Sequence, residues 1–187
     1  YSYQAAILAD ASRFSEAVQI LEEVLKQDPS NTKLLYQLGM LYDRWGKKDL
    51  SLEKMWQIIK LDAKHANALN YVGYTYAEKG IQLDEAEELI KRALEIKPDD
   101  GYITDSLGWV YYQKNLIPQA IQWLERAVEL VSDDPIILEH LGDAYLKDKR
   151  NSQALELYQR ALGNAQKDVD RTRLRGKIEG LREKAGQ

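Results

Sequence analysis

The sequence predicts an all-α fold built from repeated pairs of helices. Four glycines, Gly39, Gly73, Gly108 and Gly142, are separated by 34, 35 and 34 residues. An apolar residue precedes each glycine and a tyrosine follows each by three positions, at Tyr42, Tyr76, Tyr111 and Tyr145. Small residues recur twelve or thirteen positions after the glycines. A fixed period of this length indicates a repeat architecture in which each unit is one supersecondary motif.

Residues 101–134 show how one unit is expected to fold. Leu107 and Tyr111 lie four positions apart, so they share one face of a first helix. The spacing of Ala120, Leu124 and Ala127 predicts the apolar stripe of an amphipathic second helix. The small residues in both helices allow close approach of their backbones, where a larger side chain would overpack.

Turn residues are expected between the two helices of each unit. Gly46, Gly80 and Asn115 occupy matching places, where a left-handed residue ends the first helix. Pro118 then suits the first turn of a second helix, because its missing N–H is not needed there.

The combined pattern resembles the tetratricopeptide repeat, whose landmarks match Leu107, Gly108, Tyr111, Ala120, Leu124 and Ala127. The resemblance implies a right-handed superhelical solenoid forming a single domain over residues 1–187. Its repeats would be 1–31 (partial), 32–65, 66–100, 101–134 and 135–168, with a capping helix at 169–185. The sequence departs from the family pattern at Ile58, which replaces a small residue, and at Ala63 and Ser132, which replace the closing proline. The third repeat has one extra residue near Gln82.

The C-terminal segment is predicted to cover the end of the stack. Val169, Leu174, Ile178 and Leu181 lie on roughly one helical face. Residues 167–184 hold seven Lys or Arg against four Asp or Glu. We interpret the charged face as solvated; binding to an anionic surface is the alternative.

Composition excludes several classes of protein. The net charge is −4, and no basic stripe stands out over most of the chain, which argues against nucleic-acid binding. There is no cysteine, so disulfides and thiolate sites are excluded, and no apolar run approaches the ~20 residues of a membrane span. Because the chain begins at Tyr1, we expect it to be a piece of a longer protein.

Chemically active groups are sparse, and we expect no enzyme activity, metal or cofactor. The two histidines, His65 and His140, lack the spacing of a metal site. Four polar residues fall on first helices of adjacent repeats, but no oxyanion hole accompanies them: Asp105, Ser106, His140 and Asp143. We expect Asp143 to pair with His140 and raise its pKa.

The resemblance implies that first helices line a concave groove that holds a peptide or partner segment. Asp105, Trp109 and Tyr112 follow a helical period on a face offset from Leu107 and Tyr111. Tyr111 is assigned to the core, whereas Trp109 and Tyr112 are assigned to the groove. The alternatives for these two rings are gap filling between stacked helices and contact with an intramolecular tail. The groove candidates are Tyr36, Met40, Asn67, Asn70, Tyr74, Tyr102, Asp105, Trp109, Tyr112, His140 and Asp143.

The sequence therefore predicts a non-catalytic protein-interaction scaffold whose partner is a peptide or protein segment of unknown identity. The Lys, Asn and Arg set that clamps chaperone tails in some family members is absent, since Tyr36, Met40, Tyr71, Tyr102 and Ser106 stand at those positions. The alternatives are a self-assembling structural spacer and a positioning or regulatory domain of a larger enzyme. The sequence of residues 100–114 and 120–147 resembles bacterial members of the family and favours the cell envelope over the cytoplasm.

Overall fold

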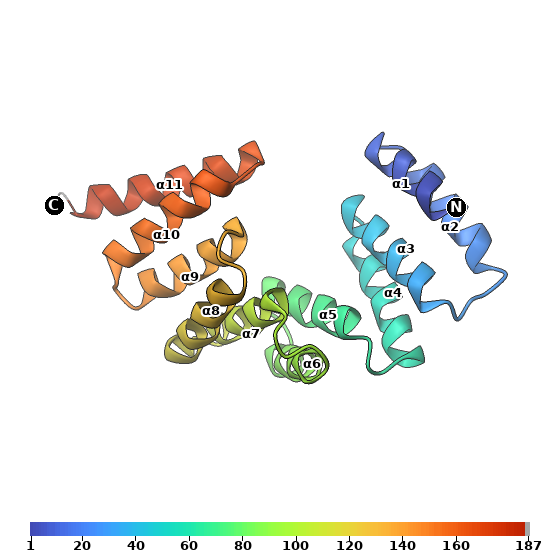
Figure 1. Ribbon diagram of the computed structural model, residues 1–187, viewed down its shortest axis with the longest axis horizontal. Coiled ribbons are helices and arrows are strands. Elements are labelled where there is room, and N and C mark those ends of the chain that lie inside the picture. The colour runs from blue at the N-terminus through green and yellow to red at the C-terminus, as the bar shows by residue number, and fades with distance from the viewer. Residues whose placement is uncertain (186–187) are drawn as a thin grey trace. The chain divides into compact units, whose positions relative to one another are not determined.

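The computed structural model describes residues 1–185, and all eleven regular elements in that range are α-helices joined by short turns (Figure 1). The predicted all-α helical-repeat fold is confirmed. The helices are α1 (Ser2–Asp10), α2 (Phe14–Leu25), α3 (Thr32–Arg44), α4 (Lys48–Leu61), α5 (Ala66–Lys79), α6 (Leu83–Ile96), α7 (Gly101–Gln113), α8 (Ile117–Leu130), α9 (Pro135–Lys147), α10 (Asn151–Asn164) and α11 (Asp168–Ala185).

The chain divides into two compact units, Tyr1–Val72 and Gly73–Gln187, with the boundary inside α5. Unit 1 contains the hairpins α1–α2 and α3–α4. Unit 2 contains the end of α5, then α6, the hairpins α7–α8 and α9–α10, and α11. No helix among residues 1–185 is long and apolar enough to cross a membrane.

The core of each unit forms between hairpins as well as within them. In unit 1 the buried cluster joins α1, α2 and α3 through residues such as Ala9, Leu21 and Leu38. In unit 2 a larger cluster runs from α8 through α9 and α10 to α11 and includes Leu124 and Leu138. A single hairpin cannot bury its own apolar face, so stacking of neighbours creates the core.

The repeat glycines lie where two helices touch. A Cβ atom added to Gly108 would lie 2.6 Å from Leu124 Cγ, and one added to Gly142 would lie 2.5 Å from Tyr158 Cε1. Both separations are shorter than van der Waals contact, so the spacing of the two helices in these hairpins depends on glycine.

The predicted turn residues adopt the left-handed conformation. Their φ angles are +76° at Gly46, +66° at Gly80 and +61° at Asn115. The turn with the extra residue contains a second left-handed position at Gln82, with φ +47°. Asp100 and Asp134, the residues directly before α7 and α9, cap these first helices by accepting hydrogen bonds from backbone N–H groups.

The repeat tyrosines tie neighbouring hairpins together. The phenol of Tyr42 donates to Glu22 at 2.8 Å, and that of Tyr145 donates to Glu125 at 2.6 Å. Tyr111 packs against the unit 2 core, as predicted, and donates to Glu87 at 3.0 Å. Each bond joins a first helix to the second helix of the preceding hairpin.

Helix α11 packs on α10 (Figure 1) and continues the repeat spacing. Leu174, Ile178 and Leu181 are buried, as the capping prediction requires. Val169 is 68% exposed, so its assignment to the buried face was wrong; it lies one residue into the helix, before the part of α11 that is buried. Gly176 follows Gly142 by 34 residues, and an added Cβ there meets no atom within 4 Å.

Candidate protein-interaction surface

In unit 2 the end of α5 and the helices α7 and α9 bring together five of the predicted groove residues: Tyr74, Asp105, Trp109, Tyr112 and His140. We call Tyr74, Trp109, Tyr112 and His140 the aromatic cluster. His140 lies at its centre: the ring centroid of Trp109 is 4.1 Å from that of His140, and the centroid of Tyr74 is 6.4 Å away. Trp109 also stacks on Tyr112, with centroids 4.7 Å apart. The 34- or 35-residue period places these side chains on adjacent first helices.

A buried ion pair supports the cluster. Nδ1 of His140 lies 3.0 Å from both carboxylate oxygens of Asp105, and the two residues are 7% and 5% exposed. Burial alone lowers the pKa of His140, but the charge and hydrogen bond of Asp105 raise it above its ordinary value. We predicted Asp143 as the hydrogen-bond partner of His140, and this was wrong, because the bond crosses to Asp105 on the preceding first helix instead of joining i and i+3. The charge of Asp143 does help to raise the pKa of His140, as predicted.

Asp143 belongs to a second network, which joins α9 to α11. Lys177 contacts both Asp143 oxygens, and Tyr158 donates to Asp143 at 2.6 Å. Arg173 makes a two-bond contact with Glu139 at 2.8 and 2.9 Å. Burial of Glu139 opposes its ionisation, yet the bonds from Arg173 and Lys177 lower its pKa. Part of the predicted groove in the fifth repeat is thus occupied by the chain's own α11.

The rings of the cluster are partly buried and partly available. Trp109, Tyr112 and Tyr74 are each of intermediate exposure. Tyr112 packs against the unit 2 core, and the Lys147 ammonium lies 4.6 Å from its ring centroid. The indole N–H of Trp109 is buried without a hydrogen-bond partner among the described residues. The rings therefore pack between helices while part of each remains exposed, and the assignment of Trp109 and Tyr112 to a groove stays a prediction.

Tyr102 is the most exposed of the predicted residues in unit 2. It is 58% exposed in the first turn of α7. Ser106, one turn further along the helix, donates its hydroxyl to the carbonyl of Tyr102 at 2.9 Å. Its proton is directed to the backbone, an arrangement that does not activate a nucleophile.

The remaining predicted residues lie in unit 1. Tyr36 and Met40 line an apolar pocket between α1 and α3. The ring centroids of Tyr36 and His65 lie 5.5 Å apart with the rings tilted, and the side chain of Asn67 hydrogen-bonds that of Tyr36. Asn70 is of intermediate exposure, with its Oδ1 atom buried and without a partner among residues 1–185. His65 accepts a hydrogen bond from the Ala68 N–H at the start of α5. Within the part of the chain that the structure describes, no three acidic or histidine side chains form a metal site.

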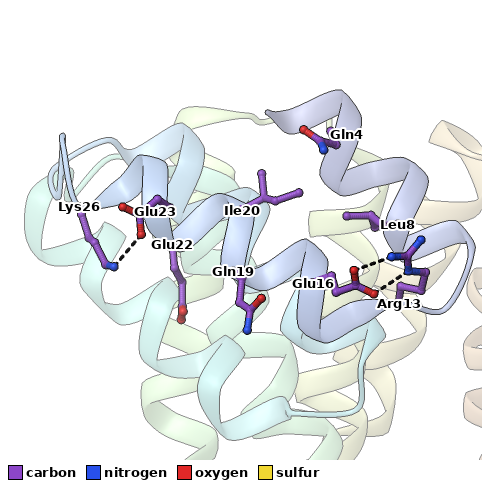
Figure 2. A pocket seen from close by; sticks show the side chains of 9 residues that line it. All are labelled: Gln4, Leu8, Arg13, Glu16, Gln19, Ile20, Glu22, Glu23 and Lys26. Atoms are coloured by element: carbon purple, nitrogen blue, oxygen red, sulfur yellow. Dashed lines mark hydrogen bonds and ion pairs between the residues drawn. The ribbon is translucent and has the colours of Figure 1, made fainter.

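A wider depression of about 700 Å³ lies along α1 and α2 (Figure 2). Four of its charged groups bond in pairs: Arg13 contacts Glu16, and Lys26 contacts Glu23 at 2.7 Å. These residues are more than half exposed, so the pairs are solvated surface contacts of small energy. The paired charges leave this depression without a feature that would select a ligand.

Two sets of residues, one in each unit, were missed from the sequence. Arg173 and Lys177 follow Glu139 and Asp143 by 34 residues each, so the repeat period would have paired them. Ala5, Ala6 and Ala9, which form a wall of the unit 1 pocket, were passed over because small side chains carry no chemical signal.

Comparison with known proteins places this architecture in a class and then in a family. This protein is a stack of helical hairpins whose first helices carry partly exposed rings. It therefore falls in the class of helical-repeat protein-interaction scaffolds. Models of the TPR repeat match residues 108–149, and models of the tetratricopeptide repeat match residues 66–100 and 137–171. The chain belongs to the tetratricopeptide-repeat family.

Three relatives illustrate the similarity. TPR repeat-containing protein PA4667 of Pseudomonas aeruginosa is 36% identical over 122 residues, which cover 64% of this chain and 20% of that protein. A probable UDP-N-acetylglucosamine–peptide N-acetylglucosaminyltransferase SPINDLY of Petunia hybrida is 33% identical over 94 residues, 50% of this chain and 10% of that protein. The crystal structure of TTC0263, a thermophilic TPR protein of Thermus thermophilus, superposes with a TM-score of 0.76 at 24% identity, covering 94% of this chain and 96% of that one. The chain spans a fifth or less of the length of these two sequence relatives.

Proposed function

We propose that the chain is a non-catalytic module that holds a segment of a partner protein against its first helices, with the aromatic cluster of unit 2 as the main contact. The observation that carries this proposal is the Asp105–His140 pair beneath Trp109. A buried ion pair contributes little to stability compared with apolar residues of the same volume. The repeat does not require it, whereas a binding surface gains from rings that are held in place before the partner arrives.

Partly exposed tryptophan and tyrosine support the same proposal. Such residues dominate the free energy of protein interfaces because they bury a large area at a small cost in side-chain entropy. Ser106 and the two histidines are all engaged in structural contacts, which supports a non-catalytic role for this segment.

The test is affinity capture from the source cell, quantified by mass spectrometry, with the wild-type chain, Trp109→Ala and Tyr112→Ala. We expect each variant to retain at least about tenfold less of a partner that the wild type enriches. Trp45→Ala is the matched control, because Trp45 is 36% exposed at the end of α3 and lies outside the cluster. Equal retention by all four chains would contradict the proposal, provided that circular dichroism shows them folded.

A second candidate function is a positioning domain within a larger protein. The coverage of the sequence relatives favours it, since this chain matches only 20% or 10% of their lengths. It is tested by assaying the full-length protein with and without residues 1–187. This candidate function is supported if the full-length protein loses its partner-dependent activity when residues 1–187 are removed, and it is contradicted if that activity is unchanged.

A further inference from the structure

An apolar trough of about 250 Å³ lies between the first helices of unit 1 and is not explained by the repeat pattern. One wall is made by Ala5, Ala6 and Ala9 of α1, and the other by Tyr36 and Met40 of α3. The volume is below the ~300–1,000 Å³ typical of small-molecule clefts. It suits one bulky side chain of a polypeptide better than a cofactor.

The trough exists because α1 has small side chains where other first helices have large ones. Counting back 34 residues from Tyr36 and Met40 gives Ser2 and Ala6. The same positions in α7 and α9 hold Asp105 with Trp109 and Glu139 with Asp143. The missing side-chain volume leaves the space open beside Met40.

Polar pairs close the two ends of the trough. At one end Ser2 Oγ donates to Gln37 at 2.7 Å. At the other end Arg44 contacts Asp10 at 2.9 Å. Residues 2 and 10 are separated by ~12 Å along a helix, which an extended segment of three or four residues spans. The Tyr36 wall is held from behind by Asn67 and His65, so it is formed before any partner binds.

Arg44 gives the trough its charge preference. Of the ten residues that line it, Arg44 is the one that is charged at neutral pH. Its side chain is 50% exposed and that of Asp10 is 73% exposed, so their ion pair is solvated and weakly held. A carboxylate on a partner can therefore share or replace Asp10.

We propose that this trough binds a bulky apolar side chain of a partner polypeptide, with an adjacent acidic residue held by Arg44. The walls supply the apolar contact, and the guanidinium, with its planar set of donors, supplies recognition of the carboxylate. The site rests on the proposed function, since it also lies on first helices, and it deepens that function by naming the chemistry of the segment held in unit 1. It uses no residue of the aromatic cluster, so binding can fail at either site while it holds at the other.

Methionine-methyl NMR of the full 187-residue chain tests the proposal, because the protein has two methionines. Met40 lines the trough, whereas Met55 is fully buried against Gly39 and serves as the internal reference. The probe is a capped peptide, Gly-Ser-Ser-Leu-Asp-Ser-Ser-Gly. We expect its addition to shift the Met40 methyl signal and leave Met55 nearly unchanged. Replacing its Leu by Ala should weaken binding by at least about tenfold, and replacing its Asp by Asn by about threefold at low salt.

Two variants of the protein complete the test. Ala6→Trp fills the trough from an exposed position and should abolish the Met40 response while the helical signal remains. Asp10→Asn releases Arg44 from its partner and should tighten binding of the acidic peptide. The proposal is overturned if the Met40 signal does not move at about 5 mM peptide, a concentration that detects weak millimolar binding. It is also overturned if the Ala peptide binds equally well, or if Ala6→Trp responds as the wild type does. Trp109→Ala should keep the Met40 response, which separates this site from the aromatic cluster.

Discussion

Replacing two glycines at the same repeat position should have opposite effects on stability. Gly108 packs against α8, whereas Gly176 lies on an exposed part of α11. At Gly108 an added methyl group would lie 2.6 Å from Leu124 Cγ and 3.1 Å from the Leu124 backbone nitrogen. The side chain can rotate away, but the backbone nitrogen moves only if α8 moves.

The magnitudes follow from two opposing terms. Overpacking costs about 1–3 kcal/mol, and alanine favours a helix over glycine by about 1 kcal/mol. We therefore expect Gly108→Ala to lower the free energy of unfolding by up to about 2 kcal/mol. Gly176→Ala has no opposing contact, so it should raise the free energy of unfolding by about 0.5–1 kcal/mol.

Urea unfolding followed by tryptophan fluorescence measures both variants in unit 2. Trp109 and Trp123 lie in unit 2, so a background with Trp45 and Trp56 replaced by Phe reports on that unit alone. The reasoning is refuted if both glycine variants shift the midpoint in the same direction by the same amount, because the contact with α8 would then have no energetic effect.

Three further predictions concern charges and the exposed end of α11. Asp105→Asn should lower the pKa of His140 and cost about 3–5 kcal/mol by breaking a buried pair; histidine NMR titration measures the pKa, with His65 as the second signal. Because folding raises the pKa of His140, the Asp105–His140 pair stabilises the protein fully below the ordinary pKa of about 6.5, and this stabilisation is lost as pH rises through the folded-state pKa. The prediction is contradicted if the free energy of unfolding of Asp105→Asn depends on pH as that of the wild type does. Burial opposes the ionisation of Glu87, but bonds from Lys114, Lys91 and Tyr111 lower its pKa to about 2. Glu87→Gln should therefore be less stable than the wild type at neutral pH, and the difference should vanish as pH falls from 4.5 toward 2. Acid unfolding curves of the two proteins that stay parallel would refute this. Val169→Ser should change stability by less than about 0.5 kcal/mol, since the side chain is largely exposed; a larger loss in urea unfolding would show that it packs.

The helices could be predicted because each repeat has to meet the same physical requirements and therefore shows the same residue pattern. Gly46 and Asn115 end first helices, and the glycine and tyrosine of each repeat set the packing face. With the same pattern occurring four times, chance matches are averaged out. The compartment and the continuity of one domain over residues 1–187 stay predictions, because they depend on more than local pattern.

The contacts between first helices were harder to predict. Asp143 was assigned to His140 because i and i+3 are neighbours on one helix, yet the true partner, Asp105, lies 35 residues away. The sequence alone does not fix which inner side chains reach across to the next helix and which point to solvent. The trough beside Met40 could not be predicted for a related reason, because the small side chains of Ser2 and Ala6 do not by themselves indicate a pocket in the sequence.

Site-specific photo-crosslinking tests the central claim, that partners bind on the first helices of unit 2, most directly. A benzophenone amino acid replaces Tyr112 in one chain and Gln122, an exposed residue of the second helix α8, in a matched chain. After capture of the partner and irradiation, we predict crosslinks to the partner from position 112 and few or none from position 122. Crosslinks from position 122 at equal or greater yield would contradict the account.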